Sequence, residues 1–166
     1  MIQIAPFSPN QAPAVTELVL AIQQGEFAIP ITLEMQPDLR DVAAFFQWGG
    51  GNFWVAQDAA EVVGTIALLD IGAGQGALRK MFVKASHRGA SHGVGKALLE
   101  TLLDWCRDRG IREVFLGSAP TLHAAHRFYE KNGFEPIRRE ELPTRFPVVE
   151  VDTRFYRRAI ETGSAS

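Results

Sequence analysis

The stretch from Leu78 to Gly95 constrains the fold more than any other part of the chain. Its first six residues predict a largely apolar strand, and the loop that follows is rich in small residues and leads directly into a helix. Glycines allow the backbone to approach a ligand closely, and the first N–H groups of a helix have no partner within the helix. Together with the positive end of the helix dipole, these groups predict a phosphate-binding loop. An ordinary strand-to-helix turn would show the same pattern, so other motifs are needed to distinguish a phosphate-binding loop from such a turn.

Two well-known phosphate motifs do not fit the sequence. The pattern GxxxxGK[ST] of the P-loop nucleotidases is absent. The glycines also lie in the middle of the chain, and no acidic residue ends a second parallel strand where a dinucleotide-binding fold would place one. The loop therefore predicts a phosphate site of another kind.

Hydrophobic periodicity predicts the order of the elements along the chain. Helices are expected at residues 9–24, from Asp38 to Phe45 or Phe46, from Val94 to a stop at Gly110, and after a cap at Thr121. Strands are expected at residues 2–5, 52–57, 62–71, 77–83, 114–116, 134–138 and 148–156. The last strand is apolar enough to pair with a second copy in a homodimer, and an internal strand covered by loops is the alternative.

A second motif lies downstream of the glycine-rich loop. Residues 126–134, HRFYEKNGF, form the end of a helix, with Asn132-Gly133 as a typical stop signal. A strand, an RG…GxG loop leading into a helix, a further strand and a helix that ends in FYEKNGF together resemble the GNAT superfamily of acetyl-CoA-dependent N-acetyltransferases. The resemblance is strongest over residues 52–135, about half of the chain.

This resemblance implies a mixed α/β fold of the GNAT type. Such a fold has a central mixed, mostly antiparallel sheet of about six to seven strands, with a splayed parallel pair and about four flanking helices. A length of 166 residues suits a single domain. We expect that domain to span residues 1–158, with a flexible tail at residues 159–166.

The resemblance also implies acetyl-CoA as co-substrate. Its pantetheine arm is expected to pair with strand backbone between the splayed strands, at Met81, Phe82 and Val83. The phosphate loop is expected to provide the other contacts, from Arg88, Gly89, Ala90, Ser91, His92, Gly93, Val94, Gly95 and Lys96. The loop is two residues longer than usual, because Arg88 precedes Gly93 by five positions instead of three. The individual contacts of residues 89–92 therefore stay open.

Three polar side chains near the loop have two interpretations each. His87 and His92 either neighbour phosphate or lie on the surface, and Lys96 either meets phosphate or is simply solvated. Two histidines without a carboxylate or thiolate at ligand spacing do not make a metal site, so no metal is expected.

Acetyl transfer to an amine needs a neutral nucleophile, a stabilised tetrahedral intermediate and a proton for the leaving thiolate. Tyr129 occupies the position of the family's usual general acid, and a phenol is protonated at neutral pH. Packing alone is the alternative role for this ring. The glutamate base of many family members has no counterpart in residues 76–79, so Glu26, His123 and a chain of waters are the candidates.

Charge and cysteine content restrict the function further. Seventeen basic and nineteen acidic residues give a formal charge of −2, which argues against a nucleic-acid partner. The apolar stretches are too short to span a bilayer, and the N-terminus lacks a signal-peptide pattern. The single cysteine, Cys106, lies beside Trp105 in an apolar helix and is expected to pack in the core. We expect a cytoplasmic protein with no membrane partner.

The sequence thus predicts an N-acetyltransferase that transfers an acetyl group from acetyl-CoA to a primary amine, directly within a ternary complex. The acceptor is expected to be a small molecule or a peptide, and no residue selects among acceptors. The alternative is a catalytically silent module that binds acyl-CoA. The absent strand carboxylate motivates that alternative, as does Leu122, where the family frequently has asparagine.

Overall fold

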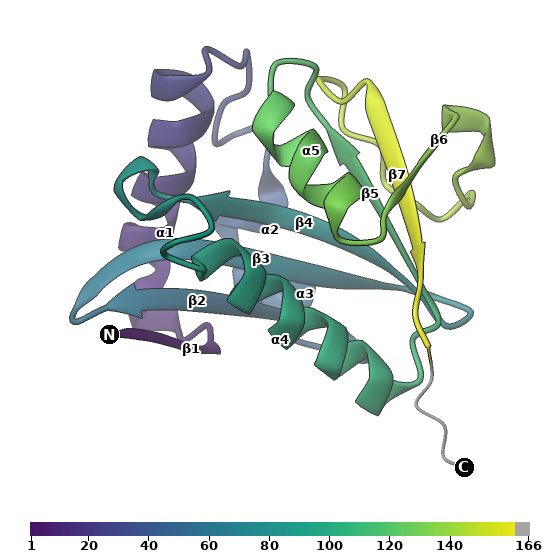
Figure 1. The fold of residues 1–166 in the computed structure, drawn as a ribbon, viewed down its shortest axis with the longest axis horizontal. Helices are drawn as coiled ribbons and strands as arrows, with labels where there is room; N and C mark the ends of the chain where they lie inside the picture. The colour runs from purple at the N-terminus through teal and green to yellow at the C-terminus, as the bar shows by residue number, and fades with distance from the viewer. Residues whose placement is uncertain (162–166) are drawn as a thin grey trace.

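The structure, a computed structural model, describes residues 1–161. Seven strands form one sheet in the order β1-β2-β3-β4-β5-β7-β6. The strands are β1 (Ile2–Pro6), β2 (Asn52–Asp58), β3 (Glu61–Gly72), β4 (Gln75–Val83), β5 (Glu113–Ser118), β6 (Glu135–Ile137) and β7 (Arg154–Ala159) (Figure 1). Neighbouring strands are antiparallel except β4 and β5, which run parallel. The predicted sheet, mostly antiparallel with one parallel pair, is confirmed.

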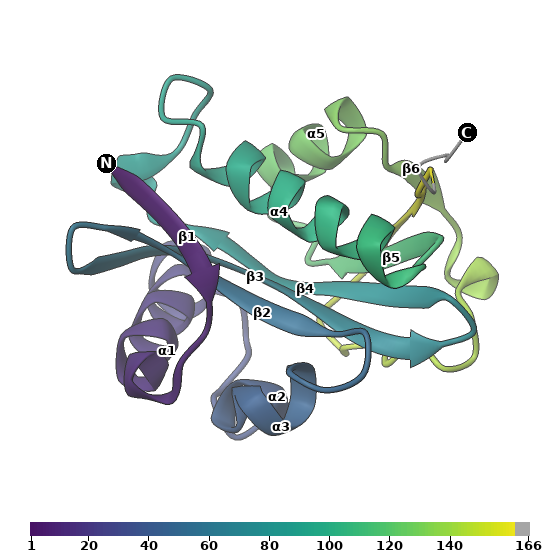
Figure 2. The same ribbon diagram turned by 90° about the horizontal axis from the view of Figure 1, so that it is seen from below.

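Five α-helices cover the two faces of this sheet. On one face lie α1 (Ala12–Leu20), α2 (Pro37–Arg40) and α3 (Val42–Phe46), and on the other lie α4 (Val94–Arg109) and α5 (His123–Lys131) (Figure 2). The larger core lies between the sheet and α4, and a second core lies between the sheet and the N-terminal helices. Cys106 is fully buried in the larger core, as predicted, and burial raises the pKa of its thiol to about 12. Within residues 1–161, no helix is long and apolar enough to cross a membrane.

Left-handed glycines delimit α4 at both ends. Gly93 is the N-cap residue with φ of 68°, and Gly110 is the C-cap residue with φ of 73°. Residues with a Cβ rarely adopt this conformation, whereas glycine adopts it freely. The predicted helix boundaries are therefore confirmed.

The N-terminal helical region differs from the prediction in two ways. The helix expected at residues 9–24 consists of a 3₁₀ turn (Pro9–Gln11), α1 and a π-helical segment, Ala21–Glu26. The helix expected from Asp38 is divided into α2 and α3 at Asp41. The Asp41 side chain accepts a hydrogen bond from the backbone N–H of Ala44 at 3.2 Å, so it caps a new helix rather than continuing the old one.

The C-terminal region also differs from the prediction. Residues 148–153 are not a strand, and β7 begins only at Arg154. Because β7 lies between β5 and β6, both of its edges are paired, and it cannot pair with a second copy as expected. The homodimer stays a prediction without this strand to support it.

The predicted tail and one predicted cap also need correction. Ala159 ends β7, and Ile160 is 5% exposed within the larger core, so the folded domain extends past residue 158. The rest of the predicted tail, residues 162–166, lies outside the described residues. At the start of α5, Leu122 is the N-cap residue and no side chain caps the helix, so the cap expected at Thr121 is wrong.

Candidate functional site

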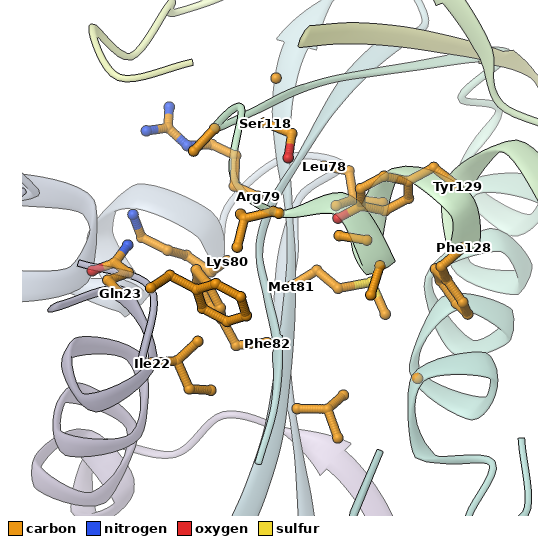
Figure 3. A pocket seen from close by; sticks show the side chains of 18 of the residues that line it. Ile22, Gln23, Leu78, Arg79, Lys80, Met81, Phe82, Ser118, Phe128 and Tyr129 are labelled. Carbon is orange, nitrogen blue, oxygen red and sulfur yellow. The ribbon is translucent and has the colours of Figure 1, made fainter. Parts of the chain in front are cut away.

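The two parallel strands separate to form a cavity. β4 and β5 pair only where Gln75–Ala77 face Glu113–Phe115, and beyond this point β5 remains paired with β7 on its other side. The cavity that begins here has a volume of about 830 Å³. Its walls come from β4, from the end of β5, from α5, from the start of α4 with the loop before it, from the segment after α1 and from the loop before β7. Figure 3 shows several of the lining side chains. The splayed pair implied by the sequence is therefore present, with a cavity in its gap.

A bulge in β4 shapes one wall of this cavity. Thr65 of β3 faces Phe82 and Ala67 faces Arg79, so the single residue between them on β3 lies opposite two residues on β4. Lys80, one of these two, has a φ of 52°, and its carbonyl accepts a hydrogen bond from the Thr65 hydroxyl at 2.6 Å. Successive side chains of a regular strand point to opposite faces. The bulge breaks this alternation, so Arg79 and Lys80 both contact the same buried carboxylate.

That carboxylate belongs to Asp38 of α2. Oδ2 of Asp38 lies 3.1 Å from Nη2 of Arg79, and Oδ1 lies 3.3 Å from Nζ of Lys80. Lys80 also donates a hydrogen bond of 2.7 Å to Gln36, whose side chain in turn exchanges hydrogen bonds with Gln23. Burial lowers the pKa of Lys80, and the Asp38 charge opposes this effect. Two cations therefore share one carboxylate at the cavity wall.

The loop before α4 presents free backbone donors. Six N–H groups have no hydrogen-bond acceptor within residues 1–161, namely those of Gly89, Ala90, Ser91, Val94, Gly95 and Lys96. A Cβ built on Gly89 or Gly93 would have no heavy atom within 4 Å, so these positions leave open space beside the donors. Converging N–H groups at a helix N-terminus fit a phosphate group. Phosphate binding by this loop stays a prediction, which the free donors and the open space favour.

Most of the predicted cofactor residues line the cavity. Those that line it are Met81, Phe82, Val83, Arg88, Gly89, Ala90, Gly93, Gly95, Lys96 and Tyr129. Ser91, His92 and Val94 do not, and Val94 is buried in the core beneath α4. Lys96 donates a hydrogen bond of 3.0 Å to Asn132, which holds its ammonium group beside α5. Cofactor binding by the whole set stays a prediction.

The two histidines near the loop lie outside the cavity. Nε2 of His87 lies 2.9 Å from a carboxylate oxygen of Asp58, at the end of β2. His92 is exposed, and its ring centroid is 5.9 Å from that of His87. This position favours the surface interpretation for both rings.

Glu26, a predicted base, forms an ion pair. Both of its carboxylate oxygens accept hydrogen bonds from Arg88, and the Nη2–Oε1 distance is 2.7 Å. Arg88 is also held by the carbonyl of Val83 at 2.7 Å, so the pair connects the end of the π-helical segment to the phosphate loop. The hydrogen bond from Arg88 lowers the pKa of Glu26, which makes its carboxylate a weaker base. Glu26 does not line the cavity.

His123, the second predicted base, lies on the exposed surface at the start of α5. Its ring centroid is 6.0 Å from that of His126, and it does not line the cavity. Leu122, one residue earlier, does line it with an apolar side chain. The roles of Glu26 and His123 as bases therefore stay predictions that this geometry does not favour.

Tyr129, the predicted general acid, lines the cavity. Its side chain extends from α5 toward β4, into the cavity (Figure 3). The ring packs against Phe134 and Tyr156, with centroids 5.6 and 5.9 Å away. The hydroxyl group has no hydrogen-bond partner within the described chain. Burial raises the pKa of Tyr129, with a further contribution from the Asp152 charge, so the phenol is neutral throughout the physiological range.

Asp152 is a cavity residue that sequence reasoning missed. It lies in the loop before β7 and lines the cavity, and its carboxylate has no hydrogen-bond or ion-pair partner within residues 1–161. A Cβ on Gly117 would lie 2.7 Å from Oδ2 of Asp152, so the carboxylate occupies space that only a glycine leaves free. Burial raises its pKa to about 6, although Arg79 and Lys80 act in the opposite direction.

Replacing Asp152 by asparagine is expected to stabilise the protein at alkaline pH. A carboxyl group whose pKa rises from 3.8 to about 6 on folding contributes stability at low pH, which is lost as the pH increases through about 6. Asp152→Asn should therefore raise the free energy of unfolding by about 1–3 kcal/mol at pH 8 and by much less at pH 4. Urea unfolding at both pH values measures the difference. Asp108→Asn on the exposed side of α4 is the control, and an equal response of the two variants would contradict the prediction.

Comparisons with known proteins agree with this geometry. Residues 18–134 match the family model described as "Acetyltransferase (GNAT) family". N-acetyltransferase family 8 member 2 of Rattus norvegicus is 33% identical over 106 residues, which cover 61% of this chain and 46% of that protein. N-acetyltransferase 8 of Homo sapiens is 29% identical over 113 residues, which cover 63% and 48%. The chain thus spans about half the length of the curated relatives it matches.

Solved structures are similar over nearly the whole chain. An acetyltransferase of the GNAT family from Staphylococcus aureus MU50 superimposes with a TM-score of 0.93 and 35% identity, covering 97% of this chain and 100% of the other. An acetyltransferase from Streptococcus agalactiae gives a TM-score of 0.90 at 28% identity, covering 95% and 98%. PaiA N-acetyltransferase from Thermoplasma acidophilum, in complex with coenzyme A, shares the fold at a TM-score of 0.72 and 18% identity, covering 96% and 99%.

Proposed function

Because the chain belongs to the acetyltransferase (GNAT) family, we propose that it is an enzyme that transfers an acetyl group from acetyl-CoA to a primary amine within a ternary complex. The observation that supports this most is the cavity, which is lined by four of the six residues with free N–H groups (Gly89, Ala90, Gly95 and Lys96) and by Tyr129. The fold it shares with PaiA, which was solved with coenzyme A bound, also supports an acyl-CoA donor.

The residues present fit such a donor along its length. The free N–H groups between Gly89 and Lys96 suit its pyrophosphate, since they lack protein acceptors and lie beside open space at a helix N-terminus. Met81, Phe82 and Val83 lie beyond the last β4–β5 pair, so the β4 edge there is not paired with β5. This open edge suits the amide groups of a pantetheine arm.

The reaction requires that one proton is donated to the leaving sulfur and that another is removed from the amine nitrogen. When bound, acetyl-CoA supplies a thioester whose carbonyl carbon accepts the amine nitrogen, after which the carbon–sulfur bond breaks. In this proposal the Tyr129 hydroxyl, which faces the cavity, donates the proton that the leaving sulfur requires. Because burial keeps this phenol neutral, the proton is available over the whole working range of pH.

Removal of a proton from the amine needs a carboxylate or water within the cavity. The ion pair of Glu26 with Arg88 and the exposed position of His123 leave Asp152 as the carboxylate that lines the cavity without a partner. We therefore assign Asp152 as the proton acceptor. Water then carries the proton from Asp152 to the solvent.

Release of free coenzyme A tests the proposed function. A thiol reagent should report release from acetyl-CoA only when a suitable amine is added. If calorimetry shows that coenzyme A binds but no amine raises thiol release above background hydrolysis, the silent binding module replaces the enzyme as the best explanation.

Replacing Gly93 by valine is expected to weaken coenzyme A binding by about tenfold or more, the effect of losing one or two hydrogen bonds to a charged group. The side chain would enter the open space beside the free N–H groups, and the left-handed φ of 68° would strain the loop. Calorimetry with coenzyme A measures the affinity.

Gly110→Val provides a matched control at the other end of α4. Gly110 has a similar φ of 73° and equally open surroundings, so the two variants should lose similar stability. Only Gly93→Val should lose affinity. Equal affinities for coenzyme A in both folded variants would show that the loop does not bind the phosphates.

A further inference from the structure

Acetyl transfer itself requires fewer charged groups than this cavity contains. Asp152 has no partner, while Arg79 and Lys80 share the single carboxylate of Asp38. We propose that the acceptor is a zwitterion, an apolar amino acid whose ammonium group binds Asp152 and whose acidic group binds Arg79. The inference rests on the proposed function and specifies the acceptor class of the same site.

The negative charge of Asp152 accounts for the ammonium group. The Asp152 carboxylate is half-buried in the cavity and has no hydrogen-bond or ion-pair partner within residues 1–161, so it is free to bind a cationic group of a ligand there. Arg79 and Lys80 attract it from β4, yet neither lies within ion-pair distance. Tyr129 lies close enough for the Asp152 charge to affect its hydroxyl group. An ammonium group bound to Asp152 is therefore also close to the proposed acid.

The positive charge on β4 accounts for the acidic group. Arg79 and Lys80 share the one carboxylate of Asp38, and Asp152, the other carboxylate near them, lies beyond ion-pair distance of both. Lys80 has a second partner in Gln36, whereas Arg79 contacts Asp38 through Nη2 alone. A guanidinium group has five N–H donors and binds carboxylates in a bidentate manner. Arg79 is thus the better equipped of the two cations to bind an acidic group.

The remaining walls of the cavity are apolar and suit an apolar side chain on the amino acid acceptor. The segment after α1 and the loop before β7 come together in a small hydrophobic cluster around Ala119. The cavity residues of this cluster include Phe27, Ile29, Ile31, Val149 and Val151. Such a surface favours a substituent that is itself apolar, because it would be removed from water on binding.

The proton balance of the reaction is consistent with these roles. Asp152 takes one proton from the ammonium group, and the free amine nitrogen then bonds to the thioester carbon. As the carbon–sulfur bond breaks, Tyr129 donates a proton to sulfur, and the nitrogen loses its second proton, which restores the phenol through water. Asp152 then returns its proton to solvent. The sum converts an ammonium group and a thioester into an amide, a thiol and one free proton.

Matched pairs of acceptors test the inference with the wild-type protein. Each pair consists of an apolar α- or β-amino acid and the amine that lacks only its carboxylate, such as leucine with 3-methylbutylamine and phenylalanine with 2-phenylethylamine. The amino acids should have kcat/KM values about 10- to 100-fold higher, the value of a hydrogen bond to a charged group. Equal or faster turnover of the carboxylate-free amines would overturn the inference but leave the proposed function intact. A lack of turnover in both classes, with coenzyme A bound, would overturn both.

Variants of Arg79 locate the contact. In Arg79→Met the preference for the amino acid over its matched amine should fall to within about threefold of unity, and Arg79→Lys should restore part of it. Arg40→Met, on the exposed side of α2, is the control and should keep the full preference. Thermal melting and coenzyme A affinity report whether each variant is folded. A folded Arg79→Met variant that keeps the preference would overturn the assignment, and if that variant does not fold, Arg79→Lys and the wild-type pairs decide.

Discussion

Replacing Tyr129 by phenylalanine is expected to lower kcat by about 10²- to 10⁴-fold, the usual contribution of a general acid. The change removes one hydroxyl group that faces the cavity and keeps the ring that packs against Phe134 and Tyr156. Coenzyme A affinity and thermal stability should therefore stay close to those of the wild type. Steady-state kinetics with the best amino acid acceptor, together with calorimetry, measure both quantities.

Tyr156→Phe is the matched control for this experiment. Tyr156 is the other tyrosine of the chain, its ring is a direct neighbour of Tyr129, and it does not line the cavity. Its hydroxyl group donates a hydrogen bond of 2.8 Å to Glu130. Loss of this bond should lower stability by about 1 kcal/mol and leave kcat within a few-fold of the wild-type value. Similar rates for the two variants and the wild type would show that Tyr129 only packs.

Asp152→Asn is expected to lower kcat/KM for the amine acceptor by about 10²- to 10⁴-fold, because both the proton acceptor and its charge are lost. In the wild type, kcat/KM should decrease as the pH falls through about 6, where Asp152 becomes protonated. The charged and titratable groups that face this carboxylate are Arg79 and Lys80 on β4 and Tyr129 on α5. The decrease at acid pH should therefore disappear in the variant.

Glu26→Gln serves as the matched comparison for Asp152→Asn. Its carboxylate is engaged by Arg88 outside the cavity, so the substitution should change kcat/KM by less than about tenfold. The reverse order of effects, a large loss in Glu26→Gln and a small loss in Asp152→Asn, would reinstate Glu26 as the base.

The parts of the site that were predicted from sequence are those encoded by neighbouring residues. Gly93 and the apolar stripe of α4 specify a left-handed residue followed by a helix, which is the local geometry of the predicted phosphate loop. Tyr129 is placed in the same way, because the helix that contains it ends at a recognisable Asn132-Gly133 stop. Local conformation sets the turn and the helix in each case, and distant contacts, such as the ion pair of Arg88 with Glu26 and the packing of Tyr129 on Tyr156, hold them in place.

The missed features depend on contacts between distant segments. Asp152 follows an apolar run that predicts a strand, and only the packing of the loop over Gly117 brings its carboxylate into the cavity. The shared contact of Arg79 and Lys80 with Asp38 requires the bulge in β4, which arises from pairing with β3. Alternation along a regular strand would instead separate these two cations.

The prediction of Glu26 as the base also failed to account for structure beyond the local sequence. The segment after α1, which contains Glu26, was correctly expected near the site, since it lines the cavity through Gln23 and Phe27. The π-helical segment, however, changes the number of residues per turn before Glu26, and the carboxylate meets Arg88 instead of the cavity. A single register change of this kind has no clear signal in the sequence.

Mass spectrometry of a complete reaction mixture tests the proposed activity most directly. With acetyl-CoA and an apolar amino acid, we expect acetylated amino acid and free coenzyme A to appear in equal amounts, while the intact mass of the protein stays unchanged. This result would show acetyl transfer to the amine without an acetyl group accumulating on the protein, as direct transfer within a ternary complex requires. Bound coenzyme A without an acetylated product from any amine, or an acetyl group that accumulates on the protein, would contradict it.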